Sequence, residues 1–520
     1  MRTRELSLRW WADNSGGRLL GGSGDSLCER IGTDTRADLG GSLFVALRGD
    51  NFDGHDYLEQ AAESGAIGLL FEPLPDVELG LLRSRYPQVG LIEVDDSAIA
   101  FSRLARAWRL YKNPYVVALT GSVGKTTTRD LIASALSESF HVHQTKANLN
   151  NIIGVPQSVF AMPEDTELAV FELGMHIPGE ISRSSLCTVP DMAIITNIGT
   201  SHIGNFEDGQ EGILRAKAEI AEGLKDGGTL LINGDDEQLR KLVPSMKNRF
   251  NIVFTHADSD MMGMEASVYA SARESLSGQS EGRIYTARDI DLTGLYASYT
   301  LVRETVAEDG TVQSVELGRM VSPAPGQHHV MNTLTAFACA AELGVGPETA
   351  NRAIGSFTPT GYRQRVSEYG PYTVINDSYN ASPESMQSAF GLLDRLADDR
   401  SGRALVALGC MAEQGSAAED LHLQVGRDLG RHAIDHAYVL GPEARFIAAG
   451  AHETSPKLIV SCYDDRSELL EALLQDLEVG DHILVKGSRM YAMERVAEGI
   501  KEFVDSRSAA DPDIVSESEE

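Results

Sequence analysis

The stretch Tyr115-Val-Val-Ala-Leu-Thr-Gly-Ser-Val-Gly-Lys-Thr-Thr-Thr128 decides the fold of the central part of the chain. Its first six residues form an apolar run of the kind that is buried in a parallel sheet. A glycine-containing turn follows, and then a segment with helical periodicity, whose apolar face consists of Leu131, Ile132, Ala135 and Leu136. A strand, a glycine turn and a helix in this order predict an α/β domain with a phosphate-binding loop.

The loop itself has the residue types that phosphate groups need. Glycines let backbone N–H groups point at the phosphates, Lys125 neutralises the terminal phosphates, and Thr126 supplies a hydroxyl to Mg²⁺. Leu119 occupies the position of the first glycine in the usual GxxxxGK[ST] spacing, and a chance Gly-Lys-Thr turn is the alternative interpretation. We expect a nucleotide to contact Gly121, Ser122, Val123, Gly124, Lys125, Thr126 and Thr127.

Further apolar runs on both sides of this loop divide the chain into three blocks. Within residues 114–358, the runs LAVFEL, MAIITNI and TLLIN end in polar residues that should converge beyond the carboxyl ends of a parallel sheet: Glu172, Asn197 to His202, and Asn233. Residues 258–318 are polar and Ser/Thr-rich, and we interpret them as antiparallel strands or hairpins before a helix near Gln327. Residues 1–113 form a small α/β unit, and residues 359–505 contain a second doubly wound sheet with the runs YTVIND, RALVALG, AYVLG, KLIVSC and HILVKGS.

Composition restricts the class of protein. A formal net charge of -31 argues against a general nucleic-acid or anionic-membrane binder. The five cysteines form no CxxC pair, which fits a reducing compartment. No apolar run approaches the roughly 20 residues that span a bilayer, and the first residues lack a secretory core. We therefore expect a soluble, cytoplasmic protein with a disordered acidic tail at residues 506–520.

Eight segments, in this order along the chain, resemble those of the Mur ligase family: GTDTRADLGGSLFVALRGDNFDGHDYL, TGSVGKTT, NLNNIIGVP, AVFELGMHIPGEI, TNIGTSHIGNF, ILRAKAEI, INDSYNASPESM and LVKGSRMYAMERV. The second of them resembles the shorter TGxxGKTT loop of these ligases and of their relative folylpolyglutamate synthase. The resemblance covers nearly the whole chain except the polar insert and the tail.

This resemblance implies an ATP-dependent ligase that joins D-alanyl-D-alanine to UDP-N-acetylmuramoyl-tripeptide through an acyl phosphate, which yields the UDP-muramoyl-pentapeptide precursor of peptidoglycan. It implies a UDP-sugar domain at 1–113, a central ATP-binding domain at 114–358 and a C-terminal Rossmann-like domain at 359–505. The expected cofactors are ATP and Mg²⁺, and the expected partners are the two substrates alone, with no nucleic acid and no membrane insertion. We expect a monomer.

The resemblance also assigns metal ligands and catalytic residues. The Mg²⁺ ligands are Thr126, Glu172, His202 and Lys217, and the catalytic residues are Lys125, Lys217 and His202. Taken alone, Glu172 at a strand end is more often a cap or a surface carboxylate, and His202 is more often a hydrogen-bonded loop residue. Both follow strands of the sheet that carries the glycine loop, which favours the metal assignment.

Lys217 shares an apolar helical stripe with Ile213, Ile220 and Leu224. A lysine in such a stripe usually extends its charge to water. The alternative is a buried neutral amine with a lowered pKa. A neutral lysine can react with CO₂ to give a carbamate, which binds a metal as a carboxylate does, and the family has a carbamylated lysine at this position.

Other residues acquire roles only through the resemblance. Nucleotide contacts fall on Asn332, Arg363 and Asp377, for which a helix polar face, a surface charge and a turn cap are the alternatives. Substrate contacts fall on Thr35, Arg36, Ser42 and Arg48 in the first block, on Asn148, Asn150 and Asn151 near the muramoyl-peptide, and on Lys486, Ser488 and Arg489 near the dipeptide. A Gly/Asp turn with solvated charges is the alternative for the first-block group.

The chain departs from the family pattern in three places. The family's GDMxELG is GCMAEQG here, with Cys410 and Gln414, Ala147 replaces the glycine of GNxNN, and TGYRQR replaces the commoner PGR-type junction. Because Cys410 replaces the aspartate of the family pattern, any role that this aspartate plays in dipeptide binding is in doubt for this chain. Three other functions compete: a relative that adds a single amino acid, a catalytically silent ATP-binding partner, and an ordinary P-loop kinase. Lys125, Glu172 and His202 argue against the silent partner, and the shortened loop and the second doubly wound block argue against the kinase.

Overall fold

The computed structural model describes residues 6–49, 52–257, 273–274, 276, 281–292, 296–325, 328–357, 361–398 and 402–510. The chain forms two compact units. Unit 1 consists of Met1–Leu119, Phe140–Ala193 and Glu219–Gly228, and unit 2 consists of Thr120–Ser139, Ile194–Ala218 and Thr229–Glu520. No helix among the described residues is both long and apolar enough to cross a bilayer.

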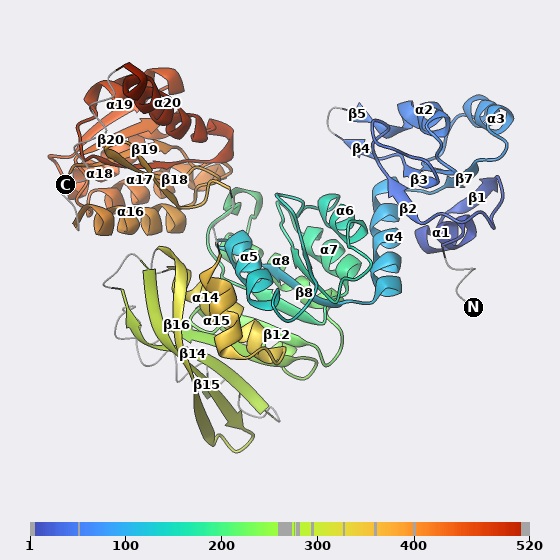
Figure 1. Ribbon diagram of the computed structural model, residues 1–520, viewed down its shortest axis with the longest axis horizontal. Coiled ribbons are helices and arrows are strands. Elements are labelled where there is room, and N and C mark those ends of the chain that lie inside the picture. The colour runs from blue at the N-terminus through green and yellow to red at the C-terminus, as the bar shows by residue number, and fades with distance from the viewer. Residues whose placement is uncertain are drawn as a thin grey trace. The chain divides into compact units, whose positions relative to one another are not determined.

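The first part of unit 1 is a five-stranded sheet with helices, as the sequence predicts for the first block (Figure 1). The strand order is β1-β7-β6-β3-β2, and only β1 pairs in the antiparallel direction. Strands β3 (Ser42–Val45), β6 (Gly68–Phe71) and β7 (Gly90–Glu93) are short, largely apolar runs with buried residues. The outer strands β1 (Arg18–Gly21) and β2 (Arg30–Gly32) are exposed at their first residue and half-buried beyond it. A small hairpin of β4 (Arg48–Gly49) and β5 (Phe52–Asp53) leads into α2 (Leu58–Glu63), and α3 (Asp76–Arg85) connects β6 to β7.

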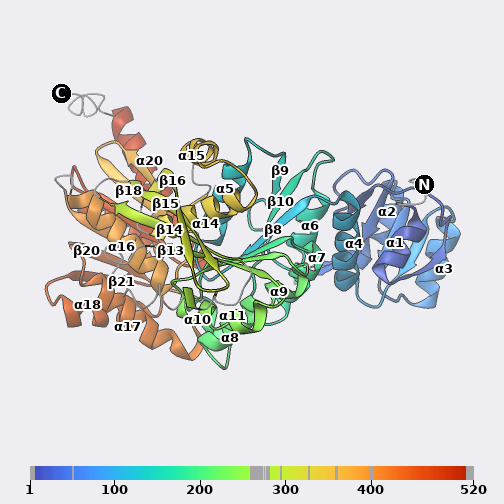
Figure 2. The same cartoon turned by 90° about the horizontal axis from the view of Figure 1, so that it is seen from below.

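An aromatic cluster joins helices α1 (Leu8–Ser15), α4 (Ser97–Lys112) and α6 (Gly154–Phe160) of unit 1. Trp11 is fully buried, donates its indole N–H to the carbonyl of Cys28 at 2.7 Å, and stacks on Trp108 at 5.9 Å between ring centroids. Trp10 meets the edge of Trp11 at 4.8 Å, and Phe160 lies against Trp11 at 6.3 Å. Figures 1 and 2 show α4 beside α6 and α7 (Glu180–Thr188). Buried rings of this size contribute a large part of the packing energy of such a layer.

A nine-stranded sheet has the order β16-β15-β14-β13-β12-β11-β8-β10-β9. Strands β8 and β10 are parallel with Leu119 opposite Glu172, so the predicted buried-strand runs do form a parallel sheet. The strands before the insert are β8 (Tyr115–Thr120), β9 (Val142–Gln144), β10 (Leu168–Glu172), β11 (Met192–Ile195), β12 (Thr229–Asn233) and β13 (Asn251–Ala257).

The polar insert forms antiparallel strands, which confirms the interpretation of its pattern. The strands β14 (Glu281–Asp291), β15 (Tyr296–Ala307) and β16 (Val312–Pro325) pair in sequence, and β14 joins β13 in the parallel direction. The segment 258–272 of this insert lies outside the described residues, as does Gln327, and helix α14 (His328–Glu342) begins at His328. Within unit 2, α14 and α15 (Pro347–Gly355) pack against α5 (Lys125–Leu136), the helix that follows the glycine loop (Figure 1).

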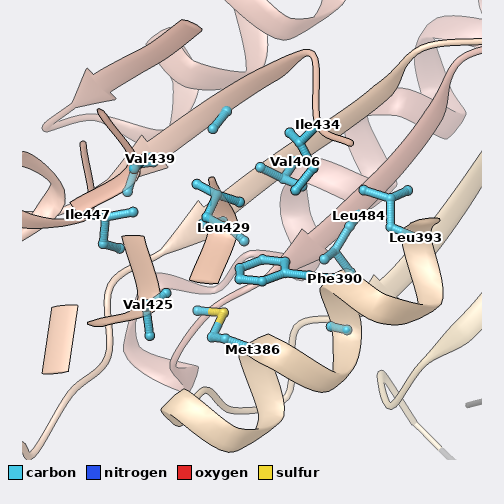
Figure 3. Packing of buried hydrophobic residues seen from close by; sticks show 14 of the residues in the cluster. Met386, Phe390, Leu393, Val406, Val425, Leu429, Ile434, Val439, Ile447 and Leu484 are labelled. Carbon is cyan, nitrogen blue, oxygen red and sulfur yellow. The ribbon is translucent and has the colours of Figure 1, made fainter. Parts of the chain in front are cut away.

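The last part of unit 2 is the second doubly wound sheet, with the order β17-β18-β22-β19-β20-β21. Figure 3 shows side chains of α16 (Pro383–Asp398) and α17 (Ala418–Leu429), among them Met386, Phe390 and Leu429, packed against Val406, Val439 and Leu484 of the strands. Each such buried side chain contributes about 1.5–3 kcal/mol. The remaining elements are β17 (Arg365–Tyr369), β18 (Tyr372–Asp377), β19 (Ala404–Gly409), β20 (His436–Leu440), α18 (Ala444–Thr454), β21 (Ile459–Tyr463), α19 (Arg466–Asp476), β22 (His482–Lys486) and α20 (Glu494–Ala510).

Helix α20 differs from the expectation for the end of the chain. It continues through residues 506–510, which we expected to begin a disordered tail, because its apolar residues Val496, Ile500 and Val504 are buried and extend the helical stripe toward its end. Residues 511–520 lie outside the described residues.

Candidate active site

The glycine loop between β8 and α5 is held by the residues that follow β11. The side-chain carbonyl of Asn197 accepts the backbone N–H groups of Ser122 and Val123 at 3.1 and 2.9 Å, and its amide donates to the carbonyl of Val123 at 2.9 Å. The hydroxyl of Ser122 in turn accepts the N–H of Gly199 at 2.8 Å. Asn197 therefore fixes the loop before any ligand arrives, a role that the sequence patterns did not indicate.

Two glycines of the loop stand where no side chain fits. Gly124 has a φ of 81°, and a Cβ added there would lie 2.7 Å from Oδ1 of Asn332. A Cβ on Gly121 would lie 1.9 Å from the hydroxyl oxygen of Thr196. Glycine is thus required both for the left-handed turn before α5 and for the close approach of the neighbouring segments.

Both predicted catalytic lysines reach the loop. Nζ of Lys125 donates to the carbonyls of Gly121 at 2.8 Å and Ser122 at 3.2 Å, while Nζ of Lys217, from α8 (Gln210–Ala218), donates to the Gly121 carbonyl at 2.9 Å. Thr126, at the start of α5, is buried, and Thr127 is half-buried. The structure therefore brings Lys125 and Lys217 to one point.

Lys217 is only 2% exposed, and its stripe partners Ile213 and Ile220 are fully buried. Of the two alternatives, burial rather than extension to water is the one that occurs. Among the described residues no carboxylate pairs with its amine. Burial, and then the charge of Lys125, lower the pKa of Lys217 well below its ordinary value. The neutral amine is therefore accessible, as a reaction with CO₂ requires.

Glu172 ends β10 in unit 1 and is 1% exposed. Its carboxylate accepts the side-chain amide of Asn150 at 2.8 Å, and its N–H donates to the hydroxyl of Thr145 at 3.1 Å. It is a buried strand-end carboxylate and not a surface cap. Asn151, predicted to face substrate, instead accepts the N–H of Gly154 at 2.7 Å at the start of α6, and Asn148 is exposed. Nearby Ala147 adopts a φ of 49°, the left-handed conformation that suits the family's glycine at this position.

His202 precedes the turn η3 (Ile203–Asn205) in unit 2, and its Nδ1 is hydrogen-bonded to the carboxylate of Glu413. The same segment is bound by a second acid, because Glu384 accepts the N–H and the hydroxyl of Thr200 at 2.9 and 3.0 Å. Both acids belong to the predicted third block. The sequence patterns did not indicate a role for either acid, although Glu413 lies inside GCMAEQG and Glu384 inside INDSYNASPESM.

A chain of hydrogen bonds links the glycine-loop helix to the third block. Thr128 donates to Asn332 at 3.2 Å, Asn332 contacts Nδ1 of His329 at 3.3 Å, and Nε2 of His329 contacts the amide oxygen of Gln364 at 3.0 Å. The N–H of Gln364 donates to Asp377 at 3.2 Å, and Asp377 pairs with Lys486 at 2.6 Å. The predicted nucleotide residues Asn332 and Asp377 and the predicted dipeptide residue Lys486 thus belong to one buried network.

The other third-block candidates are held by local contacts. The guanidinium of Arg363 lies over the ring of Tyr379 at 3.8 Å. Ser488 accepts the N–H of Ala412 at 2.9 Å and is buried, whereas Arg489 is exposed and pairs with Glu494 at 2.7 Å.

The first-block candidates lie in unit 1, in the turn after β2 and at the first residues of β3 and β4. Arg36 forms a bidentate pair with Asp34, and Arg48 pairs with Asp53 at 2.7 Å and Glu72 at 3.0 Å. Ser42 is buried and donates to the carbonyl of Leu39 at 2.6 Å, and Thr35 is half-buried. Arg36 and Arg48 are exposed cations whose local partners are carboxylates. An arriving diphosphate would compete with those carboxylates for the guanidinium groups.

The donor set suits a hard cation. Thr126 and His202 of unit 2 offer a hydroxyl and an imidazole, Glu172 of unit 1 offers a buried carboxylate, and oxygen donors are those that Mg²⁺ prefers. Lys217 fits this set as a carbamate, because a carbamate supplies the anionic oxygen donors that Mg²⁺ prefers, which neither an ammonium nor a neutral amine does. Its burial without a carboxylate partner among the described residues makes that conversion chemically reasonable.

These features, a glycine loop on a parallel sheet and a second doubly wound sheet after an inserted antiparallel segment, are those of an ATP-binding α/β enzyme. Three family models match the chain: the Mur ligase catalytic domain over residues 28–109, the Mur ligase middle domain over 119–340 and the Mur ligase glutamate ligase domain over 363–489. The chain belongs to the Mur ligase family.

Within that family, the chain is similar to enzymes that carry one name, UDP-N-acetylmuramoyl-tripeptide–D-alanyl-D-alanine ligase. The protein of that name from Bacillus subtilis (strain 168) is 34% identical, covering 92% of this chain and 93% of the relative. The one from Escherichia coli (strain K12) is 30% identical, covering 96% of this chain and 98% of the relative.

Solved structures agree with this assignment. The crystal structure of MurF from Acinetobacter baumannii matches with a TM-score of 0.76 and 27% identity, over 96% of this chain and all of that one. MurF ligase from Thermotoga maritima in complex with ADP matches with a TM-score of 0.71 and 26% identity, over 92% of this chain and 98% of that one. The fold predicted from the resemblance is confirmed.

Proposed function

We propose that the chain joins D-alanyl-D-alanine to UDP-N-acetylmuramoyl-tripeptide with hydrolysis of ATP to ADP and phosphate, through an acyl phosphate. The observation that carries the proposal is the 34% identity, over 92% of the chain, to a ligase of that name, together with the intact glycine loop and its two lysines. The ADP complex of the Thermotoga maritima relative supports ATP as the nucleotide.

The glycine loop binds the nucleotide phosphates in this proposal. Its N–H groups and the N-terminus of α5 face the phosphates, and Lys125 leaves the carbonyls of Gly121 and Ser122 to neutralise the transferred phosphoryl group. Asn332, Arg363 and Asp377 hold the base and ribose side of the nucleotide in this proposal. We also propose that domains at 1–113, 114–358 and 359–505 close on the substrates.

Thr126, Glu172, His202 and a carbamylated Lys217 hold Mg²⁺ in this proposal. When bound, the metal offsets the repulsion between the peptide carboxylate and the phosphate that it attacks. The neutral amine of Lys217 forms an N–C bond to CO₂ and loses a proton, and the resulting anionic carbamate would supply an oxygen ligand to the metal in place of the amine. The reaction needs a neutral amine, and the lowered pKa of Lys217 supports this step.

The remaining candidates orient the substrates. Thr35, Arg36, Ser42 and Arg48 hold the UDP group, and Asn148, Asn150 and Asn151 face the muramoyl-peptide, although Asn151 would have to keep its contact with α6. Ser488 and Arg489 lie nearest the incoming dipeptide. Lys486 supports this end indirectly, because its ammonium is already held by Asp377.

The test is phosphate release with ATP and Mg²⁺ across a panel of acceptors and UDP-muramoyl-peptides. We expect rapid release only when both UDP-N-acetylmuramoyl-tripeptide and D-alanyl-D-alanine are present. Equal activity with a single amino acid as acceptor would instead assign the chain to another branch of the family. No release with any acceptor, while ADP still binds, would favour a silent partner.

A further inference from the structure

Two loops of unit 2 approach each other at a pair of glycines. A Cβ on Gly204 would lie 2.6 Å from the backbone N of Gly415, and a Cβ on Gly415 would lie 2.8 Å from Cα of Gly204. The N–H of Gly204 donates to the carbonyl of Glu413 at 3.3 Å. The approach between η3 and η4 (Gly415–Ala417) is therefore built into the sequence, because no larger residue fits at either position.

His202 and Glu413, the residues on either side of this approach, are both in the left-handed region, with φ of 65° and 61°. Such a conformation costs a residue with a side chain roughly 1–2 kcal/mol, and it persists where the surroundings enforce it, commonly at functional sites. The side chain of His202 is 20% exposed and that of Glu413 is 47% exposed. Packing of these side chains in a core therefore does not explain their left-handed backbone conformations.

The contact between these two side chains fixes the chemistry of the imidazole. A carboxylate only accepts hydrogen bonds, so Nδ1 of His202 carries the proton that it donates to Glu413. Nε2 is then the ring nitrogen with a lone pair. Histidines that bind metals generally donate their other N–H to a carboxylate or a carbonyl, which sets the tautomer and the ring orientation.

We propose that Glu413 is a positioning residue for metal binding: it holds His202 in the Nδ1–H tautomer, with Nε2 directed at the cation. The proposal rests on the proposed function, because that function makes His202 a metal ligand. Glu413 follows β19 in the second doubly wound sheet, and His202 follows β11 in the nine-stranded sheet. The metal site is therefore complete only when the glycine contact between the two segments forms.

Glu384 acts on the same segment. It holds Thr200, two residues before His202, by two hydrogen bonds. The segment that carries the metal ligand is thus bound at Thr200 by the start of α16 and at His202 and Gly204 by the turn after β19. Contacts at both ends restrict the position of the imidazole more than either would alone.

The direct test is Mn²⁺ binding to the full chain in the presence of ADP, followed by electron paramagnetic resonance. We expect Glu413→Ala to weaken Mn²⁺ binding by about 10–100-fold, the usual effect of removing a residue that orients a ligand. Glu413→Gln keeps an acceptor and should fall between. Glu453→Ala is the matched control, since Glu453 is a half-exposed acid of the same sheet domain paired with Arg427.

A second pair of variants tests the backbone approach without removing either side chain. Gly415→Ala should weaken Mn²⁺ binding in the same direction, because its Cβ forces the two loops apart. Gly310→Ala is its control, as Gly310 also has a left-handed φ, 81°, but no atom within 4 Å of an added Cβ. An effect of Gly415→Ala no larger than that of Gly310→Ala would contradict the proposal.

The tautomer gives a readout that a merely structural role would not change. Nuclear magnetic resonance spectra of protein with ¹⁵N-labelled histidine report which ring nitrogen is protonated. The ring signals that are lost in the His202→Ala variant belong to His202. We expect them to show a protonated Nδ1 and an unprotonated Nε2. Unchanged Mn²⁺ affinity in Glu413→Ala, or an Nε2–H tautomer in the parent protein, would overturn the proposal. The ligase activity of the parent protein is measured in a separate assay. Absence of that activity would refute the proposed function and not the role of Glu413.

Discussion

Lys125 and Lys217 donate to the same acceptor, the carbonyl oxygen of Gly121, at 2.8 and 2.9 Å. Two ammonium groups at one carbonyl would repel each other in a buried setting. The burial of Lys217 and the charge of Lys125 both lower the pKa of Lys217, so the pair is stable when Lys217 is neutral. The glycine loop therefore brings together Lys125 and a buried Lys217 with a lowered pKa, which suits phosphate binding by the first and carbamate formation by the second.

Lys217→Ala should lower kcat by at least about 100-fold, a typical cost of losing one stabilising group in a transition state. ADP affinity should change little, because Lys125 and the loop N–H groups remain. Formate or acetate in the buffer should restore part of the activity by occupying the position of the carbamate. Lys241→Ala, at an exposed lysine paired with Glu237, is the control. Full activity in Lys217→Ala would refute the carbamate role.

Lys125→Ala should also lower kcat by at least about 100-fold, because the charge that stabilises the transferred phosphoryl group is lost. Unlike Lys217→Ala, it should not respond to added carboxylates. Lys125→Arg should recover little, since a planar guanidinium does not reproduce a compact ammonium. Turnover near that of the parent protein would mean that another loop holds the phosphates. Single-turnover phosphate release measures both variants.

His329 predicts a loss of stability in acid. Burial lowers its pKa to about 4 from the ordinary 6.5. Its Nδ1 faces the amide donor of Asn332, so a proton there would lose that hydrogen bond. Between pH 6.5 and pH 4 the unfolded chain binds a proton at His329 that the folded chain does not. The contribution of the neutral His329 to the free energy of unfolding is therefore fully present above pH 6.5. It falls by up to about 3 kcal/mol as the pH decreases to 4.

Urea unfolding of the parent protein and His329→Gln at pH 7.5 and pH 5 measures this effect. The parent protein should lose more stability between the two pH values than the variant, whatever the variant costs at pH 7.5. Equal losses in the two proteins would show that His329 does not titrate in this way.

Cys410→Asp, which restores the family's usual residue, should destabilise this chain. Cys410 is fully buried, and burial, followed by the charge of Glu443, raises the pKa of its thiol to about 12. A carboxylate at the same place would be desolvated beside a like charge, at a cost of a few kcal/mol, about 2–4. Cys410→Ser should cost less. A Cys410→Asp protein with unchanged urea midpoint would show that the pocket admits a charge.

The strands and the glycine loop could be predicted because their signals are local. A buried run followed by Gly-Ser-Val-Gly-Lys defines β8 and α5 within a few residues. The spacing of Ile213 and Ile220 placed Lys217 on an apolar stripe, and burial, one of the two interpretations of that stripe, is what occurs. The resemblance added the family, which the comparisons confirm, and the activity that we propose for the chain.

Long-range pairing could not be predicted in the same way. Lys486 and Asp377 are 109 residues apart, and only the parallel register of β18 and β22 places them opposite each other. Each is a plausible ligand contact when considered separately, but their pairing makes Lys486 a buried structural cation. Glu413 was missed for the same reason, because its partner His202 lies in a loop that follows a strand of a different sheet.

The aromatic cluster of unit 1 has a practical consequence. The chain has three tryptophans, and all of them, Trp10, Trp11 and Trp108, belong to that cluster. Ultraviolet emission excited at the indole band therefore reports on unit 1 alone and is silent about unit 2. Unfolding followed by this emission and by far-ultraviolet circular dichroism would thus separate the two units without any label, and a tryptophan introduced beside the glycine loop would supply the missing signal.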